Sequence, residues 1–230
     1  MDFYPFKIPH SSLSSPIQSI FGIIDASGSM DKYWKWVAEF WNEKIPKENC
    51  ITITFDTLAK ICPSNKLSEN LKHHGGGGTN IVIPFQLFET ELQKIAPSKP
   101  ITVLFISDGE DNRISTLNER FAKHLKGDKD RVINFICLGI EKNFPTFISM
   151  KLRELYHTGD QNIPALYLIE YASEKAFFNK FESMKQYFEG VRKRDIVPEV
   201  RLFPWDKEEV FFIFTESLFL CLPLYYTKRK

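Results

Sequence analysis

Five oxygen-bearing side chains stand at positions where they could hold a hard metal cation. Asp25, Ser27 and Ser29 occupy alternate positions directly after an apolar run. Thr79 follows a run of four glycines, and Asp108 follows a second apolar run. Two carboxylates and three hydroxyls, with no His or Cys among them, suit Mg²⁺, Mn²⁺ or Ca²⁺ and are poor ligands for Zn²⁺. The pattern predicts a site for one divalent cation, with Mg²⁺ or Mn²⁺ favoured and Ca²⁺ as an alternative.

The segments that lead into these residues have the composition of buried strands. Residues 19–24 and 101–106 are continuous apolar runs, which are typical of strands covered on both faces of a sheet. Three further segments have strand-like composition: 50–55, 132–138 and 165–169. Apolar residues recur at helical spacing in five segments: 33–45, 85–95, 117–125, 144–155 and 177–188.

Strands that alternate with helices pair in parallel through right-handed crossovers. The sequence therefore predicts an α/β fold, a doubly wound and mostly parallel sheet flanked by helices, over residues 16–190. Residues 1–15 form a short N-terminal arm in this interpretation, and residues 191–230 form a C-terminal appendage with strand-forming composition.

The predicted fold also explains why the oxygen ligands would meet. Open parallel sheets bind ligands beyond the carboxyl ends of their strands, where the strand order reverses. If the strands at 19–24 and 101–106 are neighbours at such a reversal, Asp25 faces Asp108. The alternative is that Asp25, Ser27 and Ser29 cap a helix N-terminus, as Asp and Ser often do. The presence of Thr79 and Asp108 favours the cation site.

These pieces, in this order, resemble the metal-ion-dependent adhesion site of von Willebrand factor A domains. The matching pieces are Asp-x-Ser-x-Ser at 25–29, a Thr after glycines at 79, and Ser-Asp-Gly at 107–109. The resemblance covers residues 16–190, including the order of elements. It implies a Rossmann-like fold with an antiparallel edge strand in the stretch 60–71. It also implies a complete site in which Asp25, Ser27, Ser29, Thr79 and Asp108 hold the cation directly or through water.

Function is expected to follow from incomplete neutralisation of the cation. Neutral hydroxyls and waters leave part of its charge uncompensated, so the metal attracts a further anion. The resemblance implies a protein-binding module whose partner presents an Asp or Glu to the metal. One alternative is Mg²⁺-dependent phosphoryl transfer with Asp25 as nucleophile. That chemistry usually needs a carboxylate two residues later, where Ser27 stands, so we do not expect an enzyme. A second alternative is a scaffold that binds no metal.

Composition restricts the partners and the cellular location to be expected. The 230 residues carry a net charge of +1, which argues against a broad basic surface for nucleic acid. The N-terminal residues lack the apolar stretch of a signal peptide, so an intracellular, cytoplasmic location is expected. The apolar segment 210–226 could be a membrane anchor or two short strands. Glu216, Ser217 and Pro223 favour the strands, since they are costly or disruptive inside a bilayer.

Overall fold

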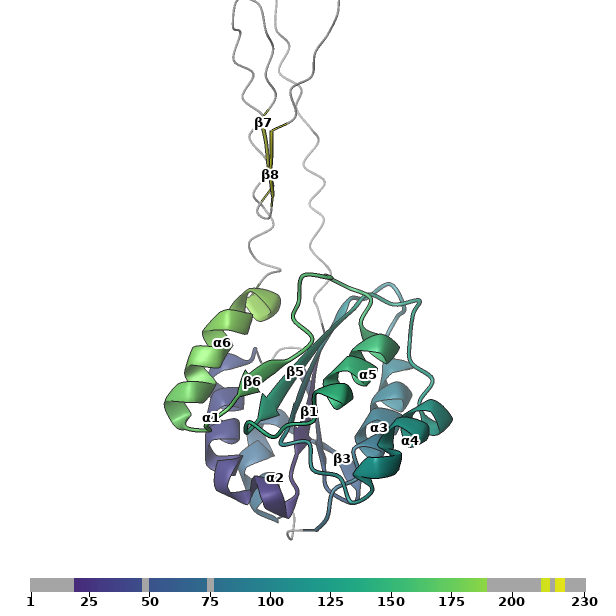
Figure 1. Ribbon diagram of the computed structural model, residues 1–230, viewed down its shortest axis with the longest axis vertical. Coiled ribbons are helices and arrows are strands. Elements are labelled where there is room, and N and C mark those ends of the chain that lie inside the picture. The colour runs from purple at the N-terminus through teal and green to yellow at the C-terminus, as the bar shows by residue number, and fades with distance from the viewer. Residues whose placement is uncertain (1–18, 47–49, 74–76, 190–211, 216–217, 222–230) are drawn as a thin grey trace, which may run out of the picture. The chain divides into compact units, whose positions relative to one another are not determined.

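A sheet of six strands forms the centre of the fold, in the order β3-β2-β1-β4-β5-β6 (Figure 1). The computed structural model describes residues 19–46, 50–73, 77–189, 212–215 and 218–221. The predicted arm at 1–15 and most of the appendage at 191–230 lie outside these residues. The parallel strands are β1 (Ser19–Asp25), β2 (Cys50–Phe55), β4 (Ile101–Ser107), β5 (Ile133–Ile140) and β6 (Tyr167–Ile169). The edge strand β3 (Ala59–Cys62) pairs antiparallel with β2.

Helices cover both faces of the sheet. One face carries α1 (Trp34–Lys44), which follows a 3₁₀ helix (Gly28–Tyr33), together with α2 (Leu67–His73) and α6 (Glu174–Glu189). The other face carries α3 (Val82–Leu92), α4 (Leu117–His124) and α5 (Thr146–Tyr156). The predicted doubly wound, mostly parallel α/β fold is confirmed by this arrangement.

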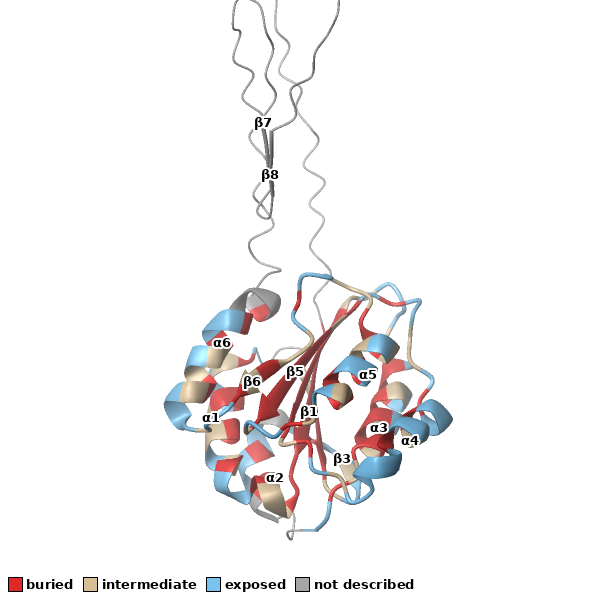
Figure 2. Cartoon of the chain, viewed as in Figure 1, coloured by how far each residue is buried: buried red, intermediate tan, exposed pale blue. Residues whose placement is uncertain are grey.

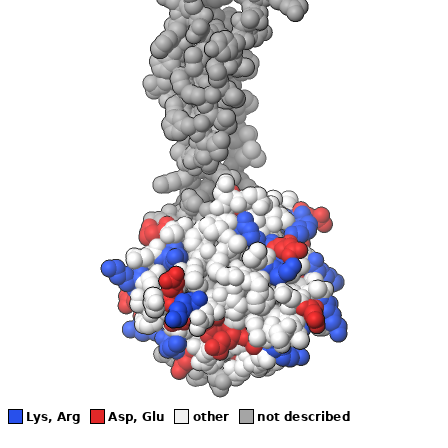
Figure 3. Space-filling view, viewed as in Figure 1, with Lys and Arg blue, Asp and Glu red and all other residues white. Residues whose placement is uncertain are grey.

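Burial follows the layers. Every residue of β1 and β4 is buried, because each strand lies inside the sheet with helices above and below it. In Figure 2 the central strands are buried along their length, and the helices turn their buried sides toward the sheet. On the face shown in Figure 3, acidic and basic side chains of the described residues are interspersed around a broad uncharged area.

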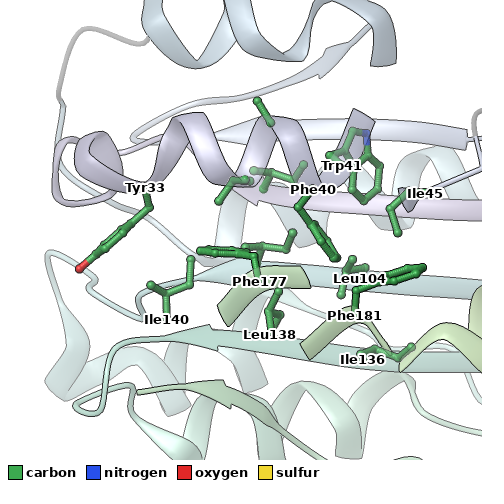
Figure 4. Close-up of a cluster of buried hydrophobic side chains, with 14 of the residues drawn as sticks. Tyr33, Phe40, Trp41, Ile45, Leu104, Ile136, Leu138, Ile140, Phe177 and Phe181 are labelled. Atoms are coloured by element: carbon green, nitrogen blue, oxygen red, sulfur yellow. The ribbon is translucent and has the colours of Figure 1, made fainter. Parts of the chain in front are cut away.

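Aromatic side chains fill both layers of the core. On one side, Phe40 of α1 packs against Phe177 and Phe181 of α6, and the buried Trp41 belongs to the same cluster (Figure 4). On the other side, the rings of Phe21 and Phe88 pack edge to face, with their centroids 4.9 Å apart. The buried Phe side chains of the described residues therefore serve close packing on both faces.

The stretch between β2 and α3 holds more structure than the sequence indicates. The antiparallel edge strand is present, but it begins at Ala59, one residue before the predicted stretch. The helix α2 was not predicted, because Leu67 and Leu71 form a single i, i+4 pair of buried residues, which is too short to show a helical period. This helix lies against α1.

The chain divides into two compact units, residues 1–188 and 189–230. In the second unit, β7 (Phe212–Thr215) pairs antiparallel with β8 (Leu218–Cys221), within the stretch for which we predicted two short strands. Among the described residues, no helix combines the length and apolar character needed to cross a bilayer.

Candidate metal centre

The strand order reverses between β1 and β4, and the two acidic positions lie at that point. These strands are parallel neighbours, with Ile24 opposite Ile106. From there the chain winds outward through β2 on one side and β5 on the other. Asp25 ends β1 and Asp108 directly follows β4, so both lie at the carboxyl edge of the sheet. The prediction that these strands are neighbours at a topological switch point is confirmed.

Asp25 is more enclosed than a loop ligand would be, since none of its surface is exposed. Its Oδ1 accepts a hydrogen bond from the Ser27 amide at 2.9 Å, and its Oδ2 accepts one from the Ser107 hydroxyl at 2.6 Å. Burial, and secondly the negative charge of Asp108, raise the pKa of Asp25 to about 7, even though the hydrogen bonds from Ser107 and Ser27 act to lower it. A buried carboxylate close to a second one is a place where a cation would be stabilised.

The two serines of the first loop face each other. Ser27 occupies the N-cap position of the 3₁₀ helix, but its side chain makes no capping bond. Its hydroxyl instead lies 3.1 Å from the hydroxyl of Ser29. Ser27 is buried and Ser29 is partly exposed. This arrangement disfavours the helix-capping alternative, because the hydroxyls do not satisfy the amides of a following helix.

The loop that carries Thr79 is joined to both acidic loops by backbone contacts. The Gly28 amide donates to the Gly77 carbonyl at 3.3 Å. The Thr79 amide donates to Asn112 Oδ1, and the Asn112 amide donates back to the Thr79 carbonyl, both at 3.0 Å. A Cβ atom at Gly78 would lie 2.2 Å from Asn112 Nδ2. Glycine is therefore required at 78 for this close approach, which the glycine run alone does not reveal.

Glu110 and Asp111 are neighbours in the chain but differ in their surroundings. Glu110 is exposed. The Asp111 side chain, however, is completely buried and forms an ion pair with Arg120 at 2.6 Å. Sequence reasoning missed this pair because Arg120 lies on the next helix, where it reads as an ordinary surface residue.

An open groove of about 570 Å³ adjoins the candidate ligands. Ser29 and Asp108 line it, so these two candidate ligands are reachable from outside. Its far wall includes Tyr33, whose hydroxyl donates to Glu141 Oε1 at 2.5 Å. Glu141 has a φ of 72°, a strained backbone conformation for a residue other than glycine.

The donor set fits a hard divalent cation. Its members are carboxylate and hydroxyl oxygens, which Mg²⁺ and Mn²⁺ accept. Within the described ranges, no three His, Cys, Asp or Glu side chains gather in a metal-holding group, so a cation here would depend on the hydroxyls as well as on Asp25 and Asp108. The Ser27–Ser29 spacing and the joined loops bring hydroxyls and carboxylates to one edge of the sheet.

Comparison with known proteins gives likeness in structure only. No protein-family model matches the sequence, and no curated protein matches it. The match with a von Willebrand factor type A protein from Catenulispora acidiphila covers 73% of this chain and 42% of that protein's chain. The sequence identity is 16% and the TM-score is 0.46. Proximal thread matrix protein 1 from the mussel byssus overlaps 74% and 47%, at 14% identity and a TM-score of 0.48.

A third similar structure is the manganese-loaded TRAP protein of Plasmodium vivax. It overlaps 73% of each chain, at 12% identity and a TM-score of 0.45. The chain thus spans less than half the length of the first two structures that it matches. The doubly wound α/β fold class is established by the sheet order and helix placement of the chain itself.

Proposed function

We propose that this chain is a divalent-cation-dependent protein-binding module. Asp25, Ser27, Ser29, Thr79 and Asp108 hold one Mg²⁺ or Mn²⁺, directly or through water, with Ca²⁺ as an alternative. A partner protein then supplies an Asp or Glu carboxylate as a further ligand. Because Mg²⁺ retains several waters in such sites, that carboxylate can take the place of an exchangeable water.

One observation supports this proposal: three separate loops, each with candidate oxygen ligands, are hydrogen-bonded to one another beside the strand-order reversal. Asp25 and Asp108 lie close enough for their charges to interact, and the Ser27 and Ser29 hydroxyls are 3.1 Å apart. The Thr79 loop is bonded to the loops on both sides of it. Such a set favours Mg²⁺ with several retained waters.

Asp25 is better placed as a ligand than as a nucleophile. Both of its carboxylate oxygens accept hydrogen bonds within the fold, and the side chain is completely buried. A phosphoryl group would have to reach it through the surrounding loops. These features support the binding module over the phosphoryl-transfer alternative.

The exposure of the site supports the approach of a carboxylate from a partner. Ser29 and Asp108 line the groove, whereas Asp25, Ser27 and Thr79 are buried. A partner's Asp or Glu that enters the groove could supply a further oxygen ligand to the cation, forming a charge-assisted contact. Partner and metal should therefore strengthen each other's binding by the same factor.

A capture experiment tests the proposal. The immobilised full chain would be incubated with cell extract in Mg²⁺, and in EDTA. We expect proteins that are retained with Mg²⁺, released by EDTA and lost with Asp25→Ala. Asp31→Ala is the matched control, because Asp31 is an exposed carboxylate in the same segment. Retention that is identical in Mg²⁺ and EDTA would contradict metal-dependent binding.

A further inference from the structure

Arg120 of α4 joins the two loops that carry Thr79 and Asp108. Its Nη1 donates to Asp111 Oδ1 at 2.6 Å, and its Nη2 donates to Asn80 Oδ1. Asp111 lies three residues after Asp108, and Asn80 directly follows Thr79. One guanidinium group therefore binds one residue from each loop at the same time.

Both of its partners also hold backbone groups. Asp111 Oδ2 accepts from the Ile81 amide at 2.9 Å, and its Oδ1 accepts from the Arg113 amide at 2.8 Å. Asn80 Oδ1 accepts from the Val82 amide at 3.3 Å. Arg120 thus orients two acceptors that hold the Ile81 and Val82 amides at the start of α3, three residues after Thr79.

The network is shielded from solvent. The Asp111 side chain is 0% exposed and the Arg120 side chain is 11% exposed. A planar guanidinium that makes two bonds in such surroundings fixes direction as well as distance. Loss of either partner would leave a buried charge without its counter-charge.

We infer that Arg120 is a positioning residue: it holds the Thr79 and Asp108 loops in the arrangement that binds the cation, although it is not itself a ligand. This inference rests on the proposed metal site. Groups that hold metal ligands in place often affect affinity about 10–100-fold when removed.

The sign of the effect separates positioning from electrostatics. Arg120→Met removes a positive charge and leaves Asp111 negative. By charge alone, this change should strengthen the attraction of the loops for a cation. Weaker Mg²⁺ binding by this variant can therefore arise only from altered geometry.

Arg131 offers a matched control. It is another buried arginine, 5% exposed, whose guanidinium donates to the carbonyls of Leu92, Ile95 and Ala96 and pairs with Asp128. It lies just before β5, at the opposite edge of the sheet from the candidate site. Arg131→Met should therefore destabilise the fold without disturbing the Thr79 and Asp108 loops.

The test uses the full chain with two measurements. Calorimetry with Mg²⁺ gives the Kd of wild type, Arg120→Met, Arg120→Lys and Arg131→Met. Hydrogen exchange without metal gives the exchange rates of the Thr79, Ile81 and Asn112 amides. These rates report local opening of the loops, because loop amides exchange through such opening. Arg120→Lys keeps the charge and one bond, so it remains informative if Arg120→Met does not fold.

We expect the Kd of Arg120→Met to rise about tenfold or more, with a smaller rise for Arg120→Lys and none for Arg131→Met. Exchange at the three amides should quicken in the Arg120 variants alone. Unchanged exchange in both Arg120 variants, or an equal loss of affinity in Arg131→Met, would overturn the inference. If wild type binds no metal, the proposed function fails, while the exchange rates still decide whether Arg120 holds the loops.

Discussion

Gly22 in the middle of β1 is a sensitive test of how the site-bearing strand packs. A Cβ atom placed there would lie 2.1 Å from Cη2 of Trp41 and 2.5 Å from Cζ2. Carbon atoms in good contact are about 3.5–4.0 Å apart, so the indole would have to move by about 1.5 Å. Trp41 is completely buried and has no solvent to move into.

The expected cost of Gly22→Ala follows from this clash. Overpacking of a dense core costs about 1–3 kcal/mol, and contact with several ring atoms places this case near the upper end. Reduced freedom of the unfolded chain returns about 0.4–1 kcal/mol. We therefore predict a net loss of about 2 kcal/mol in the free energy of unfolding.

A double-mutant cycle with Trp41→Phe assigns that loss to the contact. The smaller ring leaves room for the new methyl group, so Gly22→Ala should cost less than about 0.5 kcal/mol in that background. Urea unfolding of the four proteins, followed by far-ultraviolet circular dichroism, measures the coupling. An equal loss in both backgrounds would refute the assigned packing.

Three further predictions concern His157, Gly127 and the enzyme alternative. Burial, reinforced by the charge of Arg153, lowers the pKa of His157, whose Nδ1 accepts from the Phe135 amide at 3.1 Å. The pKa of His in an unfolded chain is about 6.5. The stabilisation from His157 is therefore complete above that pH, and it is lost as the pH falls through the lower pKa of the folded state. His157→Asn should therefore lose less stability than wild type between pH 7.5 and 5 in urea unfolding, and equal losses would contradict this. Gly127→Ala should lower the free energy of unfolding by about 2 kcal/mol. The reason is that φ of Gly127 is 72° and a Cβ atom there would lie 2.6 Å from the Leu155 carbonyl oxygen. A loss below about 0.5 kcal/mol would argue against that conformation. With Mg²⁺ and p-nitrophenyl phosphate, wild type should hydrolyse no more than Asp25→Ala, and metal-dependent hydrolysis lost in that variant would favour the enzyme alternative.

The parts of the fold with strong local patterns were predictable from sequence. The continuous apolar runs of β1 and β4 show that both strands are covered on both faces, and the alternation of elements then determines the parallel sheet. The helix α2 could not be predicted in this way, because a single apolar pair does not indicate a helix until its packing against α1 is known. Residue type and spacing indicate short elements poorly when tertiary packing decides them.

The candidate site likewise has a part that the sequence predicts and a part that it does not. The five proposed ligands follow from residue type and from their position after strands and glycines. The groups that hold the loops do not, because Asp111, Asn112 and Arg120 have the polarity of surface residues. Ser107 likewise reads as part of a motif, and only the structure shows its hydroxyl bonded to Asp25.

The most direct test of the central claim is calorimetric titration of the full chain with Mg²⁺ and with Mn²⁺. Wild type should bind one equivalent, and Asp25→Ala should bind none, because one of two proposed carboxylate ligands is lost. Ser27→Ala should bind more weakly than wild type, since water can replace a hydroxyl, and Asp31→Ala should bind as wild type does. Unfolding measured alongside must show that Asp25→Ala is folded, because Asp25 is buried in β1. Equal binding of Mg²⁺ and Mn²⁺ by wild type and a folded Asp25→Ala would contradict the proposed metal centre.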